Sequence, residues 1–202
     1  MKKYAIETER LFLQPLTYEQ LKLYLANNGS LEAELGIIFH PRVIHPELRE
    51  ALENTLLPSI ADSINYHFFT LWTMISKEYN CMVGDLCFKG APCEDGDVEI
   101  GYGIYPAFER KGLVTEAVEI LCLWALRQKY VRSVKAQTGK ENIASQKVLK
   151  NNGFVFMGEE NGLLQWQLKK NSFALAPSAA VSPRLLTWFY PKDLTPDSVE
   201  CA

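Results

Sequence analysis

The chain has 202 residues, of which 48% are hydrophobic and 22% charged, and its formal net charge is −3. This length and composition fit one ordinary domain with a buried core, and they exclude global disorder and a collagen-like chain. The slight acidic excess argues against nucleic acid as a partner, because proteins that bind phosphate backbones carry a basic excess.

The sequence gives no sign of a membrane or metal partner. No apolar stretch approaches the roughly 20 residues of a transmembrane helix, and residues 1–7 lack the apolar region of a signal peptide. We therefore expect a cytoplasmic protein. The 5 cysteines and 3 histidines lack the tight spacing of metal ligands, so we expect no metal, and the odd cysteine count speaks against a disulfide framework.

The first half of the chain predicts two helices among several strands. Thr17 and Gln20 form a capping-box pattern, which marks the start of a helix. Pro46 suits the first turn of a second helix. In chain order we expect a strand at 4–14, a helix at 17–27, a less regular region at 30–45, a helix at 45–57 and a hairpin of strands at 67–76 and 81–89.

The second half alternates strands with helices. Apolar residues at helical spacing follow Gly112, and Asn161-Gly162 is a hairpin turn signal. We expect a strand at 98–105, a long helix from about 113, a strand at 131–138, a helix at 142–151 and strands at 154–157 and 163–168. This order predicts a mixed α/β domain with one central sheet.

Residues 171–202 differ in character from the rest. Residues 171–182 resemble a linker, and the strand-like segment 184–190 is apolar on both faces, so we expect it to be covered. It can pack on its own domain or add a strand to a second copy, and a monomer and a homodimer therefore both fit.

The segment 106–116 joins a predicted strand to a helix N-terminus. Free backbone N–H groups and the positive end of the helix dipole favour an anion such as a pyrophosphate there. Arg110 and Lys111 add positive charge, and Gly112 permits close backbone approach. The segment is neither a Walker A loop nor a dinucleotide fingerprint.

A second motif lies at 142–154, where Asn142 can cap a helix and Ser145 lies on the same face of its first turn. Its pattern is Asn-x-x-Ser-x-x-x-Leu-x-x-x-Gly-Phe. With Val98-Glu99-Ile100-Gly101-Tyr102-Gly103-Ile104-Tyr105-Pro106 and the Gly112 loop, it resembles the GNAT acetyltransferase superfamily, and within it the ribosomal-protein N-terminal acetyltransferases. The resemblance covers roughly residues 4–170, so we expect a GNAT-like domain at 1–170 and an extension at 171–202.

The resemblance implies an α/β fold with one mixed, mostly antiparallel sheet flanked by helices. The sheet is splayed between two parallel strands, here 98–105 and 131–138, and acetyl-CoA lies in the splay. The backbone around Ile104 would pair with the pantetheine arm, and Asn142 and Ser145 would approach the pantetheine and adenosine side. The pyrophosphate would lie on Arg110, Lys111, Gly112, Leu113, Val114 and Thr115.

The family's reaction is direct attack of a primary amine on the thioester, without a covalent acyl-enzyme. The acceptor could be a protein N-terminus or a small amine. Glu99 is our candidate for the base that relays the amine proton, and a structural carboxylate is the equal alternative. Asp85 and Tyr102 are weaker candidates.

Three positions depart from the family pattern. Glu109 puts a negative charge beside the expected pyrophosphate, and Val114 is bulkier than the usual glycine or alanine. Leu149 stands where many members have a tyrosine that protonates the leaving thiolate, and leucine cannot donate a proton. These departures keep open a second interpretation, a catalytically weak GNAT-fold module that binds acyl-CoA or a partner.

Overall fold

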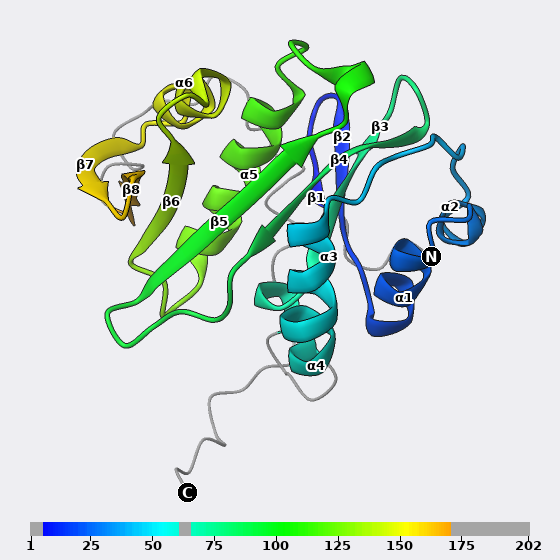
Figure 1. The fold of residues 1–202 in the computed structure, drawn as a ribbon, viewed down its shortest axis with the longest axis horizontal. Coiled ribbons are helices and arrows are strands. Elements are labelled where there is room, and N and C mark those ends of the chain that lie inside the picture. The colour runs from blue at the N-terminus through cyan, green and yellow to red at the C-terminus, as the bar shows by residue number, and fades with distance from the viewer. Residues whose placement is uncertain (1–5, 61–65, 171–202) are drawn as a thin grey trace, which may run out of the picture.

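An eight-stranded sheet organises the computed structural model, which describes residues 6–60 and 66–170 (Figure 1). The spatial order of the strands is β1-β2-β3-β4-β5-β6-β8-β7. The strands are β1 (Ile6–Glu7), β2 (Leu11–Pro15), β3 (Leu71–Ser76), β4 (Cys81–Phe88), β5 (Asp97–Ile104), β6 (Ser133–Gly139), β7 (Val155–Glu160) and β8 (Leu163–Lys169). All neighbouring strands run antiparallel except β5 and β6, which are parallel.

Helices lie on both faces of this sheet. They are α1 (Tyr18–Ala26), α2 (Ser30–Leu35), α3 (Pro46–Ala51), α4 (Leu57–Ile60), α5 (Leu113–Arg127) and α6 (Ile143–Asn151). A π-helical segment (Leu52–Leu56) joins α3 to α4, and short 3-10 turns lie at Tyr66–Phe68 and Pro106–Phe108. The predicted fold class, a mixed and mostly antiparallel sheet with one parallel pair and flanking helices, is confirmed.

The consecutive residues Tyr102 and Gly103 of β5 distinguish the two faces of the sheet, because successive residues of a strand direct their side chains to opposite faces. Tyr102 bonds to Ser145 of α6, whereas the side chain of Asp85, opposite Gly103 in the ladder, bonds to Tyr24 of α1. We call these the α6 face and the α1 face. In Figure 1, α3 lies in front of the sheet and α5 behind it.

Local sequence explains the best-predicted helices. Thr17 and Gln20 form the expected reciprocal capping box, and α1 ends at Asn27 in the left-handed conformation. The Asn142 side chain caps α6 by accepting a hydrogen bond of 3.0 Å from the Ser145 backbone N–H. The apolar side of α5 buries Ala117, Val118 and Leu121 among others, and its core contacts fix the helix against the sheet.

The structure corrects the predicted strand at 4–14, which is divided into β1 and β2. Thr8 makes the break, because its hydroxyl accepts from the Leu11 N–H at 2.9 Å and its own N–H bonds to the Leu11 carbonyl at 2.9 Å. This tight turn replaces ladder bonds with local ones. The predicted strand at 67–76 also begins later, at Leu71, after a 3-10 turn.

The first helical layer contains more than the sequence predicted. The helix expected at 45–57 runs on to Ile60, past Pro58, and its turn at Leu52–Leu56, which ends two residues before that proline, is a π-helix. Proline removes an N–H and crowds the preceding turn, and the wider turn accommodates it. Helix α2 arises in the region expected to be less regular, and the predicted segment 184–190 lies outside the described residues.

Within residues 6–60 and 66–170, no helix is long and apolar enough to cross a membrane.

Candidate active site

The parallel strands β5 and β6 separate after three residue pairs. Asp97–Glu99 pair with Ser133–Lys135, after which β6 pairs only with β8 and β5 only with β4 as far as Ile104. The strands visibly diverge in Figure 1. One edge of β5 beyond Glu99 therefore carries backbone groups without a partner strand in the described chain, which is the splay that the resemblance implied.

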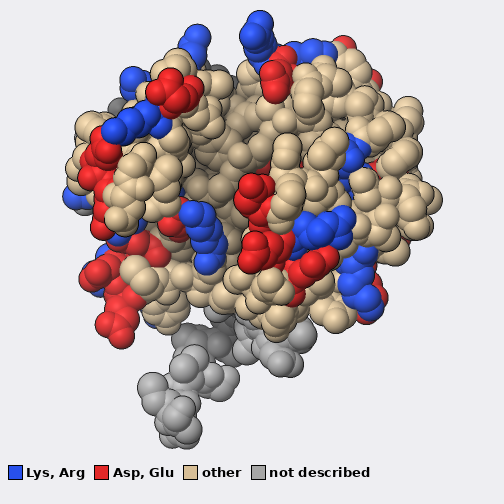
Figure 2. Space-filling model, viewed as in Figure 1, with Lys and Arg blue, Asp and Glu red and all other residues tan. Residues whose placement is uncertain are grey.

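The surface is hollowed over this splay. Figure 2 shows the hollow between the part formed by α6 and β6 and the part formed by β4 and the N-terminal helices. Gly112, the N-terminal cap of α5, has a φ of 74° and carries no side-chain cap bond. The first N–H groups of this 15-residue helix are thus available to an anion. A Cβ on Gly112 would meet only Arg10 Nη2, at 3.6 Å.

The side chains of the predicted pyrophosphate loop differ in whether they are exposed and able to contact an anion. Arg110 is exposed and adopts a left-handed φ of 60°. Lys111 Nζ bonds to the Tyr79 hydroxyl at 2.9 Å and lies over its ring, so its charge is directed at Tyr79. Leu113 is buried in the core. Val114 and Thr115 are half-buried, so the helix offers an anion mainly backbone N–H groups.

Arg10 supports this loop from behind, and sequence reasoning missed it. Its Nη1 donates to the Lys111 carbonyl oxygen at 2.8 Å, and its Nε lies 2.6 Å from Glu116 Oε2. Burial raises the pKa of Glu116, but hydrogen bonds from Thr8 and Arg10 outweigh it and hold that pKa below the ordinary value. Arg10 thus fixes the first turn of α5 to the β1–β2 turn.

On the α6 face, Asn142 and Ser145 meet the sheet through Tyr102. The Tyr102 hydroxyl donates to the Ser145 carbonyl oxygen at 3.2 Å and lies 2.8 Å from Ser145 Oγ. Burial raises the pKa of Tyr102 to about 12. Leu149, one turn further along α6, is 0% exposed. It belongs to the core and contributes no polar group to the site.

On the α1 face, two carboxylates flank two glycines of β5. Glu99 is paired with Lys89, and its side chain is 27% exposed. Asp85, opposite Gly103, is only 6% exposed. Gly101 and Gly103 lie between them, and the Ile104 backbone ends the strand. Glu109, the acidic residue of the loop, is exposed.

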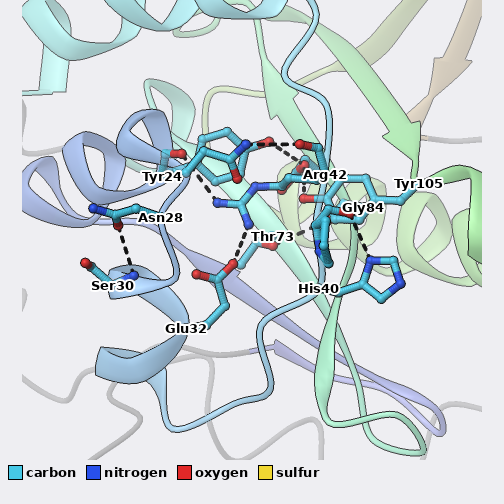
Figure 3. Close-up of polar contacts among 12 residues, drawn as sticks. Tyr24, Asn28, Ser30, Glu32, His40, Arg42, Thr73, Gly84 and Tyr105 are labelled. Carbon is cyan, nitrogen blue, oxygen red and sulfur yellow. Dashed lines mark hydrogen bonds and ion pairs between the residues drawn. The ribbon is translucent and has the colours of Figure 1, made fainter.

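Asp85 belongs to a buried polar network that the sequence did not reveal. Figure 3 labels Tyr24, Glu32, Arg42 and Tyr105 of this network. Its Oδ2 accepts hydrogen bonds from the hydroxyls of Tyr24, at 2.8 Å, and Tyr105, at 2.7 Å. Arg42 lies over the Tyr24 ring, 4.5 Å from its centre, and forms a buried ion pair with Glu32. The network joins α1, α2 and the segment before α3 to the end of β5.

Comparison with known proteins settles the family. Residues 10–155 match the model of the "Acetyltransferase (GNAT) domain", which is most of the described chain. The chain belongs to the GNAT family of acetyltransferases. It is therefore an acyltransferase, and the predicted resemblance is confirmed.

Individual GNAT relatives agree with this membership. The chain is 33% identical over 161 residues to the uncharacterized N-acetyltransferase YjdG of Bacillus subtilis, covering 80% of this chain and 95% of the relative. Two solved GNAT structures share the fold. The ribosomal-protein-S5-alanine acetyltransferase of Vibrio fischeri has a TM-score of 0.60 at 16% identity, over 83% of this chain and 97% of that one.

The second is RimL, a ribosomal L7/L12 alpha-N-protein acetyltransferase in complex with coenzyme A. It has a TM-score of 0.58 at 18% identity, over 82% of this chain and 98% of that one. Identities this low establish a common fold, and the acceptor of this chain needs its own argument.

Proposed function

We propose that this protein transfers the acetyl group of acetyl-CoA to a primary amine by direct attack, without a covalent acyl-enzyme. The observation that carries the proposal is the splay. An unpaired edge of β5 leads directly to the open N-terminus of α5, which together suit an extended arm ending in a pyrophosphate. The coenzyme A in the RimL structure supports this choice of donor.

The residues fit the donor from one end of the splay to the other. The N–H groups of Gly112 and Leu113, with Val114 and Thr115, would hold the pyrophosphate, and exposed Arg110 would add charge. Lys111 would contribute chiefly by holding the loop on Tyr79. The backbone around Ile104 would pair with the pantetheine arm. Asn142 and Ser145 would line the α6 side of the donor.

Glu99 is our proposed relay for the amine proton, through water. An amine must be neutral to attack, and ordinary amines are mostly protonated at pH 7. Glu99 lies at the closed end of the splay, on the α1 face. Its pairing with Lys89 equally suits a structural carboxylate. Positioning of the thioester by β5 N–H groups would supply much of the acceleration.

We propose a protein N-terminus or a small amine as acceptor. The α1 face of β6 and β8 carries polar side chains, with Gln137 hydrogen-bonded to Gln165 at 3.2 Å and Lys135 paired with Asp97 at 2.5 Å. A peptide could lie across this surface, and the ribosomal-protein acetyltransferases of the same fold act on protein N-termini. A cytoplasmic location, where acetyl-CoA is made and used, belongs to the same proposal.

A second candidate function is a catalytically weak module that binds acyl-CoA. Buried Leu149 favours it, because the position that holds a proton-donating tyrosine in many relatives is here part of the core. Release of coenzyme A distinguishes the two functions. Purified protein with acetyl-CoA and a panel of peptides, amino-acid amides and polyamines should release free thiol and yield an acetylated amine by mass spectrometry. Tight acetyl-CoA binding without transfer to any of these amines would favour the module.

We also propose that the catalytic domain ends near residue 170 and that 171–202 is an extension. The family match ends at residue 155, and the last described strand ends at Lys169. Truncation after Lys170 should leave the acetyl-CoA affinity unchanged. Light scattering of the full and truncated chains then tests whether segment 184–190 makes a homodimer.

A further inference from the structure

We propose that Asp85 accepts the proton of the acceptor amine, and that the amine binds beside it over the Gly101–Gly103 strip of β5. The inference rests on the proposed acetyl transfer and names the acceptor side of that site. It assigns Glu99 a structural role at the closed end of the splay, because Glu99 is ion-paired with Lys89 whereas Asp85 is buried.

Space for the amine exists on the α1 face of β5. Asp85 and Gly103 are direct partners across the β4–β5 ladder, and so are Cys87 and Gly101. Paired residues of antiparallel strands put their side chains on the same face. A Cβ on Gly103 would meet no atom within 4 Å, and one on Gly101 would meet only Cys87 Sγ, at 3.7 Å. The glycines therefore leave a strip open beside Asp85, on the strand that would hold the thioester.

The Asp85 carboxyl group is held with one oxygen unused. Both tyrosine hydroxyls donate to Oδ2, whereas the buried Oδ1 has no hydrogen-bond partner among the described residues. A buried oxygen without a partner is costly, so such a group points to a ligand or a water. An amine over Gly103 could reach Oδ1 directly or through one water.

The surroundings make Asp85 more basic than a surface carboxylate. Burial raises the pKa of Asp85, while hydrogen bonds from Tyr105 and Tyr24 and the charge of Arg42 oppose this rise without cancelling it. Arg42 is itself paired with Glu32, so its charge is shared. Cys87 follows on β4, and Lys89, immediately after the end of β4, is paired with Glu99.

Glu99 is the poorer proton acceptor by the same reasoning. Its carboxylate is held against the Lys89 ammonium, and it lies beside the last paired residues of β5 and β6. A proton on Glu99 would break that ion pair. Glu99 is therefore better suited to shaping the closed end of the splay.

The proton balance of the reaction is complete with Asp85. The ammonium gives one proton to Asp85, and the nitrogen lone pair forms the C–N bond at the thioester carbonyl carbon. The C–S bond then breaks with its electron pair on sulfur. The second proton leaves the nitrogen and converts the thiolate to the coenzyme A thiol, and Asp85 returns its proton to water.

Asp85→Asn is the central test, because asparagine keeps an oxygen that can accept from Tyr24 and Tyr105. The assay uses whichever amine of the panel has the largest kcat/KM in the wild-type protein. We expect kcat/KM to fall about 100-fold, with the acetyl-CoA Kd unchanged by calorimetry. The acid limb of the wild-type pH profile should disappear. Glu7→Gln, which removes an ion-paired carboxylate of β1 at the far edge of the sheet, is the matched control and should keep wild-type activity.

A second variant tests the placement without touching the carboxyl group, in case Asp85→Asn does not fold. Gly103→Val fills the open strip where no atom lies within 4 Å. It should raise the KM for the amine at least about tenfold with an unchanged acetyl-CoA Kd, a loss of about 1.4 kcal/mol. An unchanged amine KM would show that the amine does not bind over Gly103.

The outcomes separate this inference from the proposed function. If Asp85→Asn keeps the wild-type kcat/KM and acid limb while Glu99→Gln loses both, Glu99 is the base and Asp85 is structural. If the wild-type protein acetylates no amine in the panel, the proposed transfer fails, and the assignment of Asp85 fails with it.

Discussion

Tyr102 of β5 and Ser145 of α6 are joined by the Tyr102 hydroxyl, which donates to the Ser145 carbonyl oxygen at 3.2 Å and lies 2.8 Å from its Oγ. The same first turn of α6 is capped by Asn142. The contact thus ties the splayed strand to the helix that would line the other side of the donor. The Tyr102 hydroxyl holds α6 in place and is a poor proton donor, because burial raises the pKa of Tyr102 to about 12.

Tyr102→Phe removes the hydrogen bonds to Ser145 in the first turn of α6 but keeps the aromatic ring, so it should leave no cavity. We expect a loss of about 1 kcal/mol of unfolding free energy and a several-fold weaker acetyl-CoA affinity, measured by urea denaturation and calorimetry. The pH dependence of kcat should keep its shape. A lost basic limb in that profile would instead make Tyr102 a proton donor.

Gly84 and Gly103 provide a matched pair for packing within the sheet. A Cβ on Gly84 would lie 2.4 Å from the Gly103 carbonyl oxygen and 2.4 Å from Met74 Cε, whereas one on Gly103 would meet nothing within 4 Å. Gly84→Ala should lower the unfolding free energy by about 3 kcal/mol. Gly103→Ala should change it by less than about 0.5 kcal/mol. Equal changes in thermal unfolding would refute this description of the β4–β5 contact.

Arg10 should control donor affinity through the loop that it holds. Arg10→Gln removes the contacts to Glu116 and the Lys111 carbonyl, and we expect an acetyl-CoA Kd about tenfold higher, from the loss of charge-assisted hydrogen bonds. Arg49→Gln is the control, since Arg49 also pairs with a carboxylate, Glu53, and a backbone oxygen. Equal calorimetric affinities for the two variants would leave Arg10 without this function.

His67 should make stability sensitive to acid. Burial lowers the pKa of His67 to about 4, from 6.5, so between these values the unfolded chain binds a proton that the folded chain does not. The contribution of neutral His67 is present above pH 6.5 and is lost as the pH falls toward 4. In urea denaturation at several pH values, His67→Phe should lose less stability on acidification than the wild-type protein. Parallel losses would contradict the assignment.

Short sequence patterns correctly predicted the helices whose ends are fixed by hydrogen bonds between residues close in sequence. The Thr17–Gln20 box and the Asn142 cap each involve residues three apart, so a single window of sequence contains the whole interaction. The resemblance motif placed the splay correctly, because it records the order of β5, α5, β6 and α6. Short α2 was missed because its 6 residues, between Gly29 and Gly36 with positive φ, are too few to show a helical repeat of apolar residues.

The supporting contacts of the site could not be predicted in this way. Arg10 and Glu116 are 106 positions apart, and Tyr24 and Asp85 are 61 apart. Only the folded sheet brings such pairs together, and each residue alone has an ordinary local pattern. Lys111 illustrates the same limit, because its charge predicted a phosphate contact while its side chain bonds to Tyr79 from the β3–β4 turn. The donor contacts of Ile104, Asn142 and Ser145 remain predictions.

Calorimetric titration with acetyl-CoA tests most directly the claim that the splay and the N-terminus of α5 form a donor site. The wild-type protein should bind one acetyl-CoA with a Kd in the range of about 1 μM to 1 mM, typical of enzyme substrates. Gly112→Glu, which adds bulk and negative charge at the α5 cap, should show no binding heat while remaining folded. No binding by the wild-type protein at millimolar acetyl-CoA, or equal binding by both proteins, would contradict the account.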